Sequence, residues 1–465
     1  MTIIKKYLIF IIAIVILLGT FVAVNAIDMQ DTDAASQLKL GEKYLSELQY
    51  EEALIAFNNV LEIEPKNVDA KLGIAETLLQ TDKINEAISF LAEELEKYDD
   101  AGLYSKLAEI YENSGEYERA ISLLNQAIDK TDDEEIKKTQ KELLNKHMSL
   151  SNTIALGNEH AAVINGGKVY GKGSNKFGQL GMNDETYNKL TDINFTGTAS
   201  RLFCGDYTTY IVDDQNKLWT SGVNLTGQGG LSYIGLPYEK KYVKVDGIDN
   251  VLMLSSGSNH TLLVKNDNTL WGAGDNTYRQ LGFGDIESVD SFKPIKSFRD
   301  VMFVDSADNY SLILKLDGTL WGMGALPIDL NLSQNNAGLI AKDIIQADVN
   351  ENMIAAVDYD GKMHIFGWNR MFPTQYDDYG IAEILEFDKK VKTVSICDDG
   401  AAVIDYDNEV YVFSSTINGY YEKLNVEGNI LSMDGRDSKI IIKTDIKNYI
   451  IDFSSYSKYE ITELK

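Results

Sequence analysis

Cysteine and histidine are scarce in this sequence. Among 465 residues there are two cysteines and four histidines. Cys204 and Cys397 cannot supply the closely spaced thiolates of a zinc site, and we expect them to be small core residues too far apart for a disulfide. There is also no phosphate-binding loop or dinucleotide fingerprint, and no Ser–His–Asp arrangement that can be placed. The sequence therefore predicts a protein that is not an enzyme and that holds no cofactor or metal.

Positive charge is scarce as well. The chain has 43 lysines and arginines against 71 acidic residues, which gives a formal net charge of −28. A field of this sign repels the phosphates of nucleic acids and the headgroups of anionic lipids, so neither is an expected partner of the folded part. Prolines number only 5 but glycines number 36, which is typical of turn-rich β domains.

One long apolar run lies near the N-terminus. Two lysines precede residues 7–24, an uncharged stretch of 18 residues, which is the lower limit for crossing a bilayer as a helix. The lysines should stay in the cytoplasm, so the rest of the chain should lie outside. Residues 1–26 are either a retained anchor, which makes a single-pass membrane protein, or a signal peptide cleaved near Ala26, which makes a secreted one. Residues 27–33 form a polar linker, and only residues 7–24 should contact the membrane.

A helical repeat occupies residues 34–147. Small residues recur where two helices must cross closely, and large ones recur where the gaps between helices must be filled. Three units, offset by 34 and then 33 residues, carry this pattern: Leu40, Gly41, Tyr44, Ala53, Phe57 and Pro65; Ile74, Ala75, Leu78, Ala87 and Leu91; Leu107, Ala108, Tyr111, Ala120, Leu124 and Ala127. The pattern resembles the tetratricopeptide repeat. The resemblance implies three repeats and a final capping helix over Asp132–His147.

The same resemblance implies an inner groove that receives extended peptides. One groove position of the repeat is held by Glu42, Glu76 and Glu109. Three carboxylates on one wall would favour a basic or amino-terminal peptide segment. The alternative interpretation is a solvated helix face in an acidic protein.

From Ser151 onward the pattern changes to short β-rich runs separated by Gly, Asn and Asp. Three units share a tight turn, an aromatic strand and a glycine-rich loop: Gly157–His160, Tyr170 and Gly178–Gly181; Gly205–Thr208, Trp219 and Gly227–Gly230; Gly257–His260, Trp271 and Gln280–Gly282. This combination resembles the regulator of chromosome condensation repeat, strongly in these units and weakly after Asn331. The resemblance implies a β-propeller, in which His160 and His260 would pack and hydrogen-bond between blades.

The aromatic position recurs seven times, which predicts seven blades of four strands. It is held by Tyr170, Trp219, Trp271, Trp321, His364, Tyr411 and Tyr449. The three repeat tryptophans should be core residues. Because an open ring would leave exposed strand edges, we expect the last strand, Tyr459–Leu464, to pair within the blade that contains Ile154–Gly173.

The predicted fold is therefore multidomain. It consists of an N-terminal transmembrane or signal helix, an all-α tetratricopeptide solenoid over residues 34–147, and an all-β seven-bladed propeller over residues 148–465. The tight turns between the first two strands of each blade should emerge on one face near the central channel.

Two further groups of residues are candidate partner sites on the propeller. The first is a ring of acids in these turns, which would attract a basic partner, although turn preference alone also favours Asp: Glu159, Asp206, Asp308, Glu351, Asp398, Asp399 and Asp437. The second is a loop with the composition of a binding hot spot, whose residues alternatively fill space in a degenerate repeat: Trp368, Arg370, Met371 and Phe372.

These features favour a protein–protein interaction scaffold held outside the cytoplasm, with a protein or peptide partner. A secreted inhibitor of an extracellular enzyme is the alternative, because beta-lactamase inhibitory protein II is an exported propeller of this repeat type. Guanine-nucleotide exchange, the activity that the family's founder implies, is a remote alternative, because export would separate the chain from a small GTPase.

Overall fold

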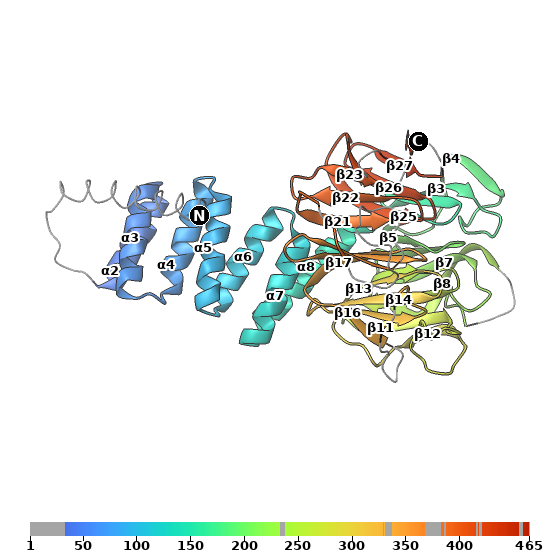
Figure 1. Ribbon diagram of the computed structural model, residues 1–465, viewed down its shortest axis with the longest axis horizontal. Coiled ribbons are helices and arrows are strands. Elements are labelled where there is room, and N and C mark those ends of the chain that lie inside the picture. The colour runs from blue at the N-terminus through green and yellow to red at the C-terminus, as the bar shows by residue number, and fades with distance from the viewer. Residues whose placement is uncertain are drawn as a thin grey trace. The chain divides into compact units, whose positions relative to one another are not determined.

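The computed structural model describes residues 33–232, 238–328, 330, 337–367, 383–385, 387–414, 417, 421–454 and 459–464. The predicted signal or anchor segment, residues 1–26, lies outside these ranges. Among the helices within them, none is both long and apolar enough to cross a membrane. The chain divides into two compact units, Met1–Ile110 and Tyr111–Lys465 (Figure 1).

The first unit is a series of short helices, as the repeat pattern predicts. Polar side chains cap several of them: Asp33 accepts the N–H of Ser36 at 2.6 Å, and Asn67 accepts that of Ala70 at 3.0 Å. Such caps satisfy N–H groups that lack a partner in the first turn of a helix. The helices are α2 (Ala34–Ser46), α3 (Tyr50–Ile63), α4 (Val68–Gln80), α5 (Ile84–Lys97) and α6 (Ala101–Asn113), which runs across the boundary between the units.

Phe57 forms the centre of the core between α2, α3 and α4. Its side chain is 1% exposed, and its ring lies directly against two glycines. A Cβ atom added to Gly41 would lie 2.7 Å from the ring, and one added to Gly73 would lie 2.4 Å from it. The small residues therefore let the helices approach, and one aromatic ring fills the remaining space.

The second unit contains a seven-bladed propeller, as the repeat count predicts. Each blade is one antiparallel sheet of four strands that are consecutive in the sequence. The first four blades are built as follows: blade 1 from β1 (Ile154–Leu156), β2 (His160–Asn165), β3 (Lys168–Ser174) and β4 (Thr186–Asp192); blade 2 from β5 (Ala199–Cys204), β6 (Thr208–Asp213), β7 (Lys217–Val223) and β8 (Tyr238–Asp249); blade 3 from β9 (Val251–Ser256), β10 (His260–Lys265), β11 (Leu270–Asp275) and β12 (Ser288–Pro294); blade 4 from β13 (Val301–Ser306), β14 (Tyr310–Lys315), β15 (Leu320–Gly324) and β16 (Ala337–Ala341).

The remaining three blades follow the same order. They are blade 5 from β17 (Ile344–Val349), β18 (Met353–Asp358), β19 (Met363–Gly367) and β20 (Glu383–Ile384); blade 6 from β21 (Val391–Ile396), β22 (Ala401–Asp405), β23 (Val410–Phe413) and β24 (Tyr421–Leu424); and blade 7 from β25 (Ile430–Arg436), β26 (Lys439–Thr444), β27 (Asn448–Asp452) and β28 (Glu460–Glu463).

The predicted aromatic positions fall at one register in the third strand of every blade. Trp219 pairs with Ile211, for example, and Tyr449 pairs with Ile442. The three repeat tryptophans, Trp219, Trp271 and Trp321, are half-buried rather than core residues, because their polar ring edges turn to the preceding hairpin. Trp219 donates from Nε1 to Asp213 at 2.9 Å, and Trp271 donates to Thr269 at 3.0 Å. Each therefore fixes its hairpin turn to its strand.

The prediction for ring closure was wrong. The final strand, β28, pairs with β27 in its own blade, and β4 already supplies the fourth strand of blade 1. Side chains close the ring instead. Leu464 is buried in one cluster with Ile154 and Leu156. The backbone N–H of Leu156 donates to the carboxylate of Asp434 in blade 7 at 2.6 Å.

Buried polar side chains join other neighbouring blades. His160 in blade 1 contacts Thr209 in blade 2 through Nε2 at 2.9 Å, and His260 in blade 3 contacts Ser311 in blade 4 at 2.8 Å. Burial lowers the pKa of His160 to about 3 and that of His260 to about 4. Both imidazoles are therefore neutral at physiological pH, and the predicted structural role of these histidines is confirmed.

Two helices precede the propeller within the second unit: α7 (Tyr117–Thr131) and α8 (Glu134–Ser151). Arg119 on α7 lies 4.2 Å from the ring centroid of Tyr406 and donates to the carbonyl oxygen of Tyr359 at 3.4 Å. The helix α7 packs against β17, and α8 packs against β9 and β25. Because β9 and β25 belong to blades on opposite sides of the ring, α8 must cross one end of the central channel.

Candidate binding site at the channel mouth

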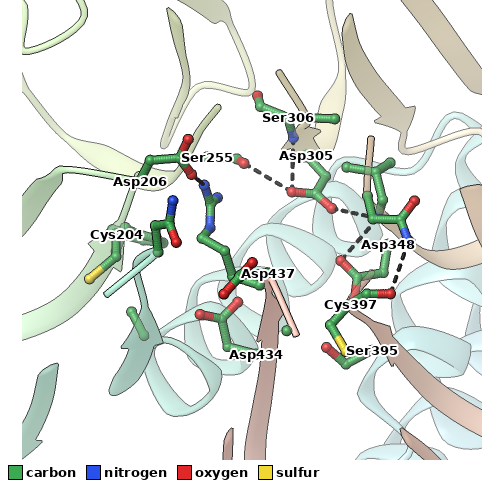
Figure 2. Close-up of a pocket in the computed structure, with 18 of the residues that line it drawn as sticks. Cys204, Asp206, Ser255, Asp305, Ser306, Asp348, Ser395, Cys397, Asp434 and Asp437 are labelled. Atoms are coloured by element: carbon green, nitrogen blue, oxygen red, sulfur yellow. Dashed lines mark hydrogen bonds and ion pairs between the residues drawn. The ribbon is translucent and has the colours of Figure 1, made fainter. Parts of the chain in front are cut away.

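The first strands of all seven blades surround a hollow of about 740 Å³ at the centre of the propeller. These strands begin at the end that α8 crosses and finish in the tight turns at the opposite end, which we call the channel mouth. Every turn contributes to the mouth, and the equivalent position in the seven turns is held by Asn158, Asp206, Ser258, Asp308, Glu351, Asp398 and Asp437. Figure 2 shows carboxylates from several blades turned toward the hollow, with a helix behind them.

Three aspartates on the wall of the hollow repeat one contact. Asp305 accepts the N–H of Val349 in the next blade at 3.0 Å, and Asp348 accepts that of Ile396 in the next blade at 2.7 Å. Asp434 makes the equivalent contact to Leu156. Each carboxylate thus ties the inner strand of one blade to the inner strand of its neighbour, which gives these acids a structural role.

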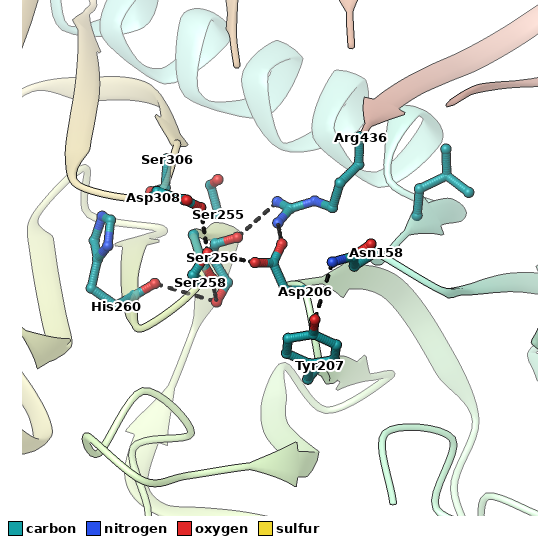
Figure 3. A network of polar contacts seen from close by, with 12 residues as sticks. Asn158, Asp206, Tyr207, Ser255, Ser256, Ser258, His260, Ser306, Asp308 and Arg436 are labelled. Atoms are coloured by element: carbon teal, nitrogen blue, oxygen red, sulfur yellow. Dashed lines mark hydrogen bonds and ion pairs between the residues drawn. The ribbon is translucent and has the colours of Figure 1, made fainter. Parts of the chain in front are cut away.

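One arginine crosses the mouth. Arg436 from blade 7 donates from Nη1 to Asp206 in blade 2 at 2.6 Å and from Nη2 to the carbonyl oxygen of Ser256 in blade 3 at 2.8 Å. Figure 3 shows the network continuing through Ser258, whose hydroxyl lies between Asp206 and Asp308. Arg436 is 18% exposed and Asp206 is 17% exposed, so the ion pair is largely removed from solvent. The arginine therefore links blades that do not touch along the ring.

Crowding and burial raise the pKa of several carboxyls in the channel. The neighbouring Asp308, by hydrogen bonding and by its charge, raises the pKa of Glu351 to about 7. Partial burial, with Asp437 and Asp399 nearby, raises the pKa of Asp398 to about 6, although this side chain still reaches the surface. Burial likewise raises the pKa of Asp434 to about 6, against the opposing effects of the Leu156 N–H and Arg436. The mouth therefore gains negative charge as the pH rises through neutrality.

The raised pKa values of these carboxyls should make the free energy of unfolding of the propeller fall as the pH rises from about 5 to 8. In the unfolded chain these carboxyls release their protons near pH 4, about two to three units below their folded values, so the folded state holds more protons in this window. Carboxyls with a lowered pKa, such as Glu94, titrate below this window. His160 and His260 oppose the trend below about pH 7, because only the unfolded chain protonates them there. The carboxyl contribution is therefore read as the difference in slope between the wild-type protein and a variant that lacks these carboxyls. Urea unfolding at a series of pH values measures the slope.

Glu351→Gln combined with Asp434→Asn should flatten this slope, since both replacements keep an oxygen acceptor without a titrating proton. The control is Asp285→Asn, whose carboxylate is 93% exposed. Equal slopes in the wild-type protein and the double variant would show that these channel carboxyls do not govern the pH dependence.

The glycine-rich loops of blades 1 to 3 hold their shape through two side chains. In blade 1, Asn175 accepts the N–H of Leu180 at 2.8 Å, and Gln179 accepts that of Phe177 at 3.0 Å. The equivalent bonds recur in blade 2 from Asn224 and Gln228 and in blade 3 from Asn276 and Gln280. These loops lie at the mouth end, and they present exposed Phe177, Leu225 and Tyr278 to solvent.

The structure brings together most of the predicted acid ring. Asp206, Asp308, Glu351, Asp398 and Asp437 line the hollow. Glu159 and Asp399 lie one residue further along their turns: Glu159 lines a second, smaller pocket, and Asp399 accepts a hydrogen bond from Ser438 at 2.9 Å. Arg436 and the three wall aspartates were not predicted from the sequence. The sequence feature that marks the wall aspartates is a charged residue within an otherwise apolar strand, as in Val304-Asp305 and Met433-Asp434.

The groove carboxylates differ in their surroundings. Glu42 is exposed, but Lys106 lies between the other two, 2.9 Å from Glu76 and 3.1 Å from Glu109. Two of the three charges are therefore partly neutralised within the solenoid. The predicted loop of Trp368, Arg370, Met371 and Phe372 lies outside the described residues.

A helical repeat array followed by a closed propeller defines a repeat protein with broad surfaces. Family models match the tetratricopeptide repeat over residues 44–105 and 101–129, and the regulator of chromosome condensation (RCC1) repeat over residues 254–280. The chain therefore combines tetratricopeptide repeats with a propeller of the regulator of chromosome condensation type.

Curated relatives match parts of the chain. The ultraviolet-B receptor UVR8 of Arabidopsis thaliana is 31% identical over 153 residues, which cover 31% of this chain and 33% of the receptor. The X-linked retinitis pigmentosa GTPase regulator of Mus musculus is 36% identical over 97 residues, which cover 21% of this chain and 10% of the regulator. The matched stretches thus span a third or less of these two relatives.

Solved structures share the fold. Human WBSCR16 superposes with a TM-score of 0.56 at 16% identity, covering 63% of this chain and 86% of that chain. Prp20p of Saccharomyces cerevisiae, whose structure is described together with its binding to Gsp1p and histones, superposes with a TM-score of 0.53 at 15% identity, covering 61% of this chain and 80% of that chain.

Proposed function

We propose that this chain is a protein–protein interaction scaffold that works outside the cytoplasmic membrane and catalyses no reaction. The channel mouth carries the proposal. It holds exposed carboxylates and exposed apolar side chains next to one hollow, on a ring whose inner strands are tied together by side-chain contacts. A rigid surface of this kind loses little conformational entropy when a partner binds. The groove of the helical repeats offers a second surface.

The location outside the cytoplasm rests on the sequence of residues 1–26. Intact mass measurement of the protein from its native cells tests it. A full-length mass in the membrane fraction supports the anchor, and a mass that begins near Ile27 in the medium supports secretion. A full-length chain in the cytosolic fraction would contradict both.

Affinity capture from a cell-envelope extract tests the scaffold. The baits are the full chain, a mouth variant (Glu351→Gln with Asp398→Asn) and a groove variant (Glu42→Lys with Glu109→Lys). We expect the wild-type chain to retain a specific protein that one of the variants loses, because all four side chains are at the surface. Failure of the wild-type chain to retain any specific protein would count against the scaffold.

Two outcomes would redirect the proposal to its alternatives. If the captured protein is an enzyme and the chain blocks its activity, the chain is an inhibitor. If the chain accelerates nucleotide release from a small GTPase, it is an exchange factor. Each activity is assayed directly with the purified full chain.

A further inference from the structure

The channel mouth has two chemically different sides. On the side of blades 1 and 2 the hollow is lined by Phe177, Tyr207, Leu225 and Tyr238. The ring of Phe177 meets those of Tyr207 and Tyr238 edge-on, with centroids 5.1 and 6.2 Å apart. Phe177 remains 38% exposed and Leu225 remains 56% exposed. Apolar groups that stay in contact with water at a hollow are typical of interaction surfaces.

The side formed by blades 5 to 7 is acidic. Asp206 in blade 2 is neutralised by Arg436, but the carboxylates of Glu351, Asp398 and Asp437 are at the surface. Asp308 in blade 4 and Asp399 in blade 6 add further negative charge next to them. An unneutralised cluster beside a hollow attracts a cation, since the walls of a cleft concentrate its field.

The apolar side is held in a fixed geometry. The backbone N–H of Phe177 is bound by Gln179, and Asn158 donates to the hydroxyl of Tyr207 at 3.2 Å. In blade 2, Thr226 next to Leu225 donates to the carbonyl oxygen of Asn259 in blade 3 at 2.6 Å. A partner that packs on these side chains therefore needs to order little of the surface that receives it.

We propose that the channel mouth docks one segment of a partner protein in which a lysine or arginine stands beside an aliphatic or aromatic side chain. The apolar side chain would pack on Phe177, Tyr207 and Leu225, and the basic one would lie over Glu351 and Asp398. This inference rests on the proposed function and assigns its partner chemistry.

Charge selects this occupant over others. The net charge of −28 repels nucleic acids and anionic lipids, so a basic protein segment is the macromolecule that the field attracts. A purely apolar ligand would leave Glu351 and Asp398 desolvated without a counter-charge, which is costly. A hollow of about 740 Å³ is of the size that receives a few side chains rather than a folded domain.

Selection of short random peptides displayed on phage, with the full chain as the immobilised target, tests the proposal. The affinities of selected peptides are then measured by fluorescence anisotropy for five proteins. They are the wild-type chain, an apolar variant (Phe177→Ser with Leu225→Ser), an acid variant (Glu351→Gln with Asp398→Asn), the groove variant (Glu42→Lys with Glu109→Lys), and a control (Ile446→Ser with Asp360→Asn). The control residues are 65% and 73% exposed and lie in turns at the end of the propeller that α8 crosses.

We expect the selected peptides to carry Lys or Arg next to an apolar residue. Binding should weaken by about tenfold or more in the apolar variant and in the acid variant, and it should be unchanged in the control. It should also weaken with added salt and at a pH of about 5, where Glu351 and Asp398 are protonated, because the basic side chain then loses its counter-charges.

Selected peptides without basic residues, or peptides that bind both mouth variants as tightly as the wild-type chain, would overturn the proposal. Peptides lost only from the groove variant (Glu42→Lys with Glu109→Lys) would also overturn it. Such peptides would show that the helical repeats, rather than the channel mouth, bind the partner. The proposed scaffold function would remain supported. The proposed scaffold function is contradicted only if the envelope capture retains no specific protein. Its failure can therefore be told apart from a failure of the docking proposal.

Discussion

Arg436→Met should lower the free energy of unfolding of the propeller by about 3–5 kcal/mol, which is the usual cost of removing one partner from a buried ion pair. The substitution leaves Asp206 without a cation and removes a positive charge from beside Asp434. It also removes the donor to the Ser256 carbonyl oxygen, which joins blade 7 to blade 3 across the mouth. Urea unfolding at neutral pH, followed by tryptophan fluorescence, measures the loss.

The loss should shrink at a pH of about 5, because the pKa of Asp434 lies near 6 and the carboxyl is then protonated. Arg279→Met is the matched control. Its ion pair with Asp285 is 3.0 Å long, with the side chains 48% and 93% exposed, so its removal should cost no more than about 1 kcal/mol. Equal losses in the two variants would show that Arg436 does not brace the ring.

Phe57→Ala should destabilise the helical repeats by about 3–5 kcal/mol, the range found for emptying a buried aromatic site. The side chain is 1% exposed, and its ring fills the space that Gly41 and Gly73 leave open. The structure around such a cavity relaxes only partially, so the cost exceeds the transfer free energy of the ring alone. Circular dichroism at a helix-sensitive wavelength follows this transition.

All four tryptophans lie in the propeller sequence after Ser151, so tryptophan fluorescence reports on that unit separately. We expect Phe57→Ala to shift the helical transition and leave the fluorescence transition in place. Ile55→Ala, at a side chain 43% exposed on the same helix, should change neither by much. A shift of both transitions by Phe57→Ala would mean that the two units unfold together.

The repeating parts of the fold were predictable because their causes are local. A tetratricopeptide unit needs small residues at fixed spacings, and Ala53 and Ala75 are indeed fully buried. A tight hairpin needs a residue that accepts positive φ, and Asn216, Asn268 and Gly318 have φ of 59°, 61° and 72° at the predicted turns. These requirements recur in each unit, so counting them gives the number of blades.

Ring closure could not be predicted in this way, because it depends on where one strand runs rather than on its composition. The sequence Tyr459–Leu464 suits an outer strand of either the first or the last blade. What decides between them is that β4 already occupies the outer place in blade 1. Closure then comes from Leu464, Asp434 and Lys443, which donates to Thr153 at 2.8 Å.

The candidate site was predictable only in outline. The tight turns of all blades meet at one end of a propeller, so their acids had to lie near each other. Which of them stay unneutralised depends on Arg436, which stands at a position held by glycine in blades 1 to 3. Its partners, Asp206 and Ser256, lie 230 and 180 residues away in sequence, beyond any local pattern.

Calorimetric titration of the captured partner into the full chain and into the Glu351→Gln, Asp398→Asn variant tests whether the protein is a scaffold that binds through the channel mouth. The intact mass of the recovered partner is measured afterwards. We expect saturable binding at a fixed stoichiometry, an affinity about tenfold weaker for the variant, and a partner of unchanged mass. A partner that is cleaved or modified, or that binds the variant as tightly as the wild-type chain, would contradict a scaffold that acts through the channel mouth.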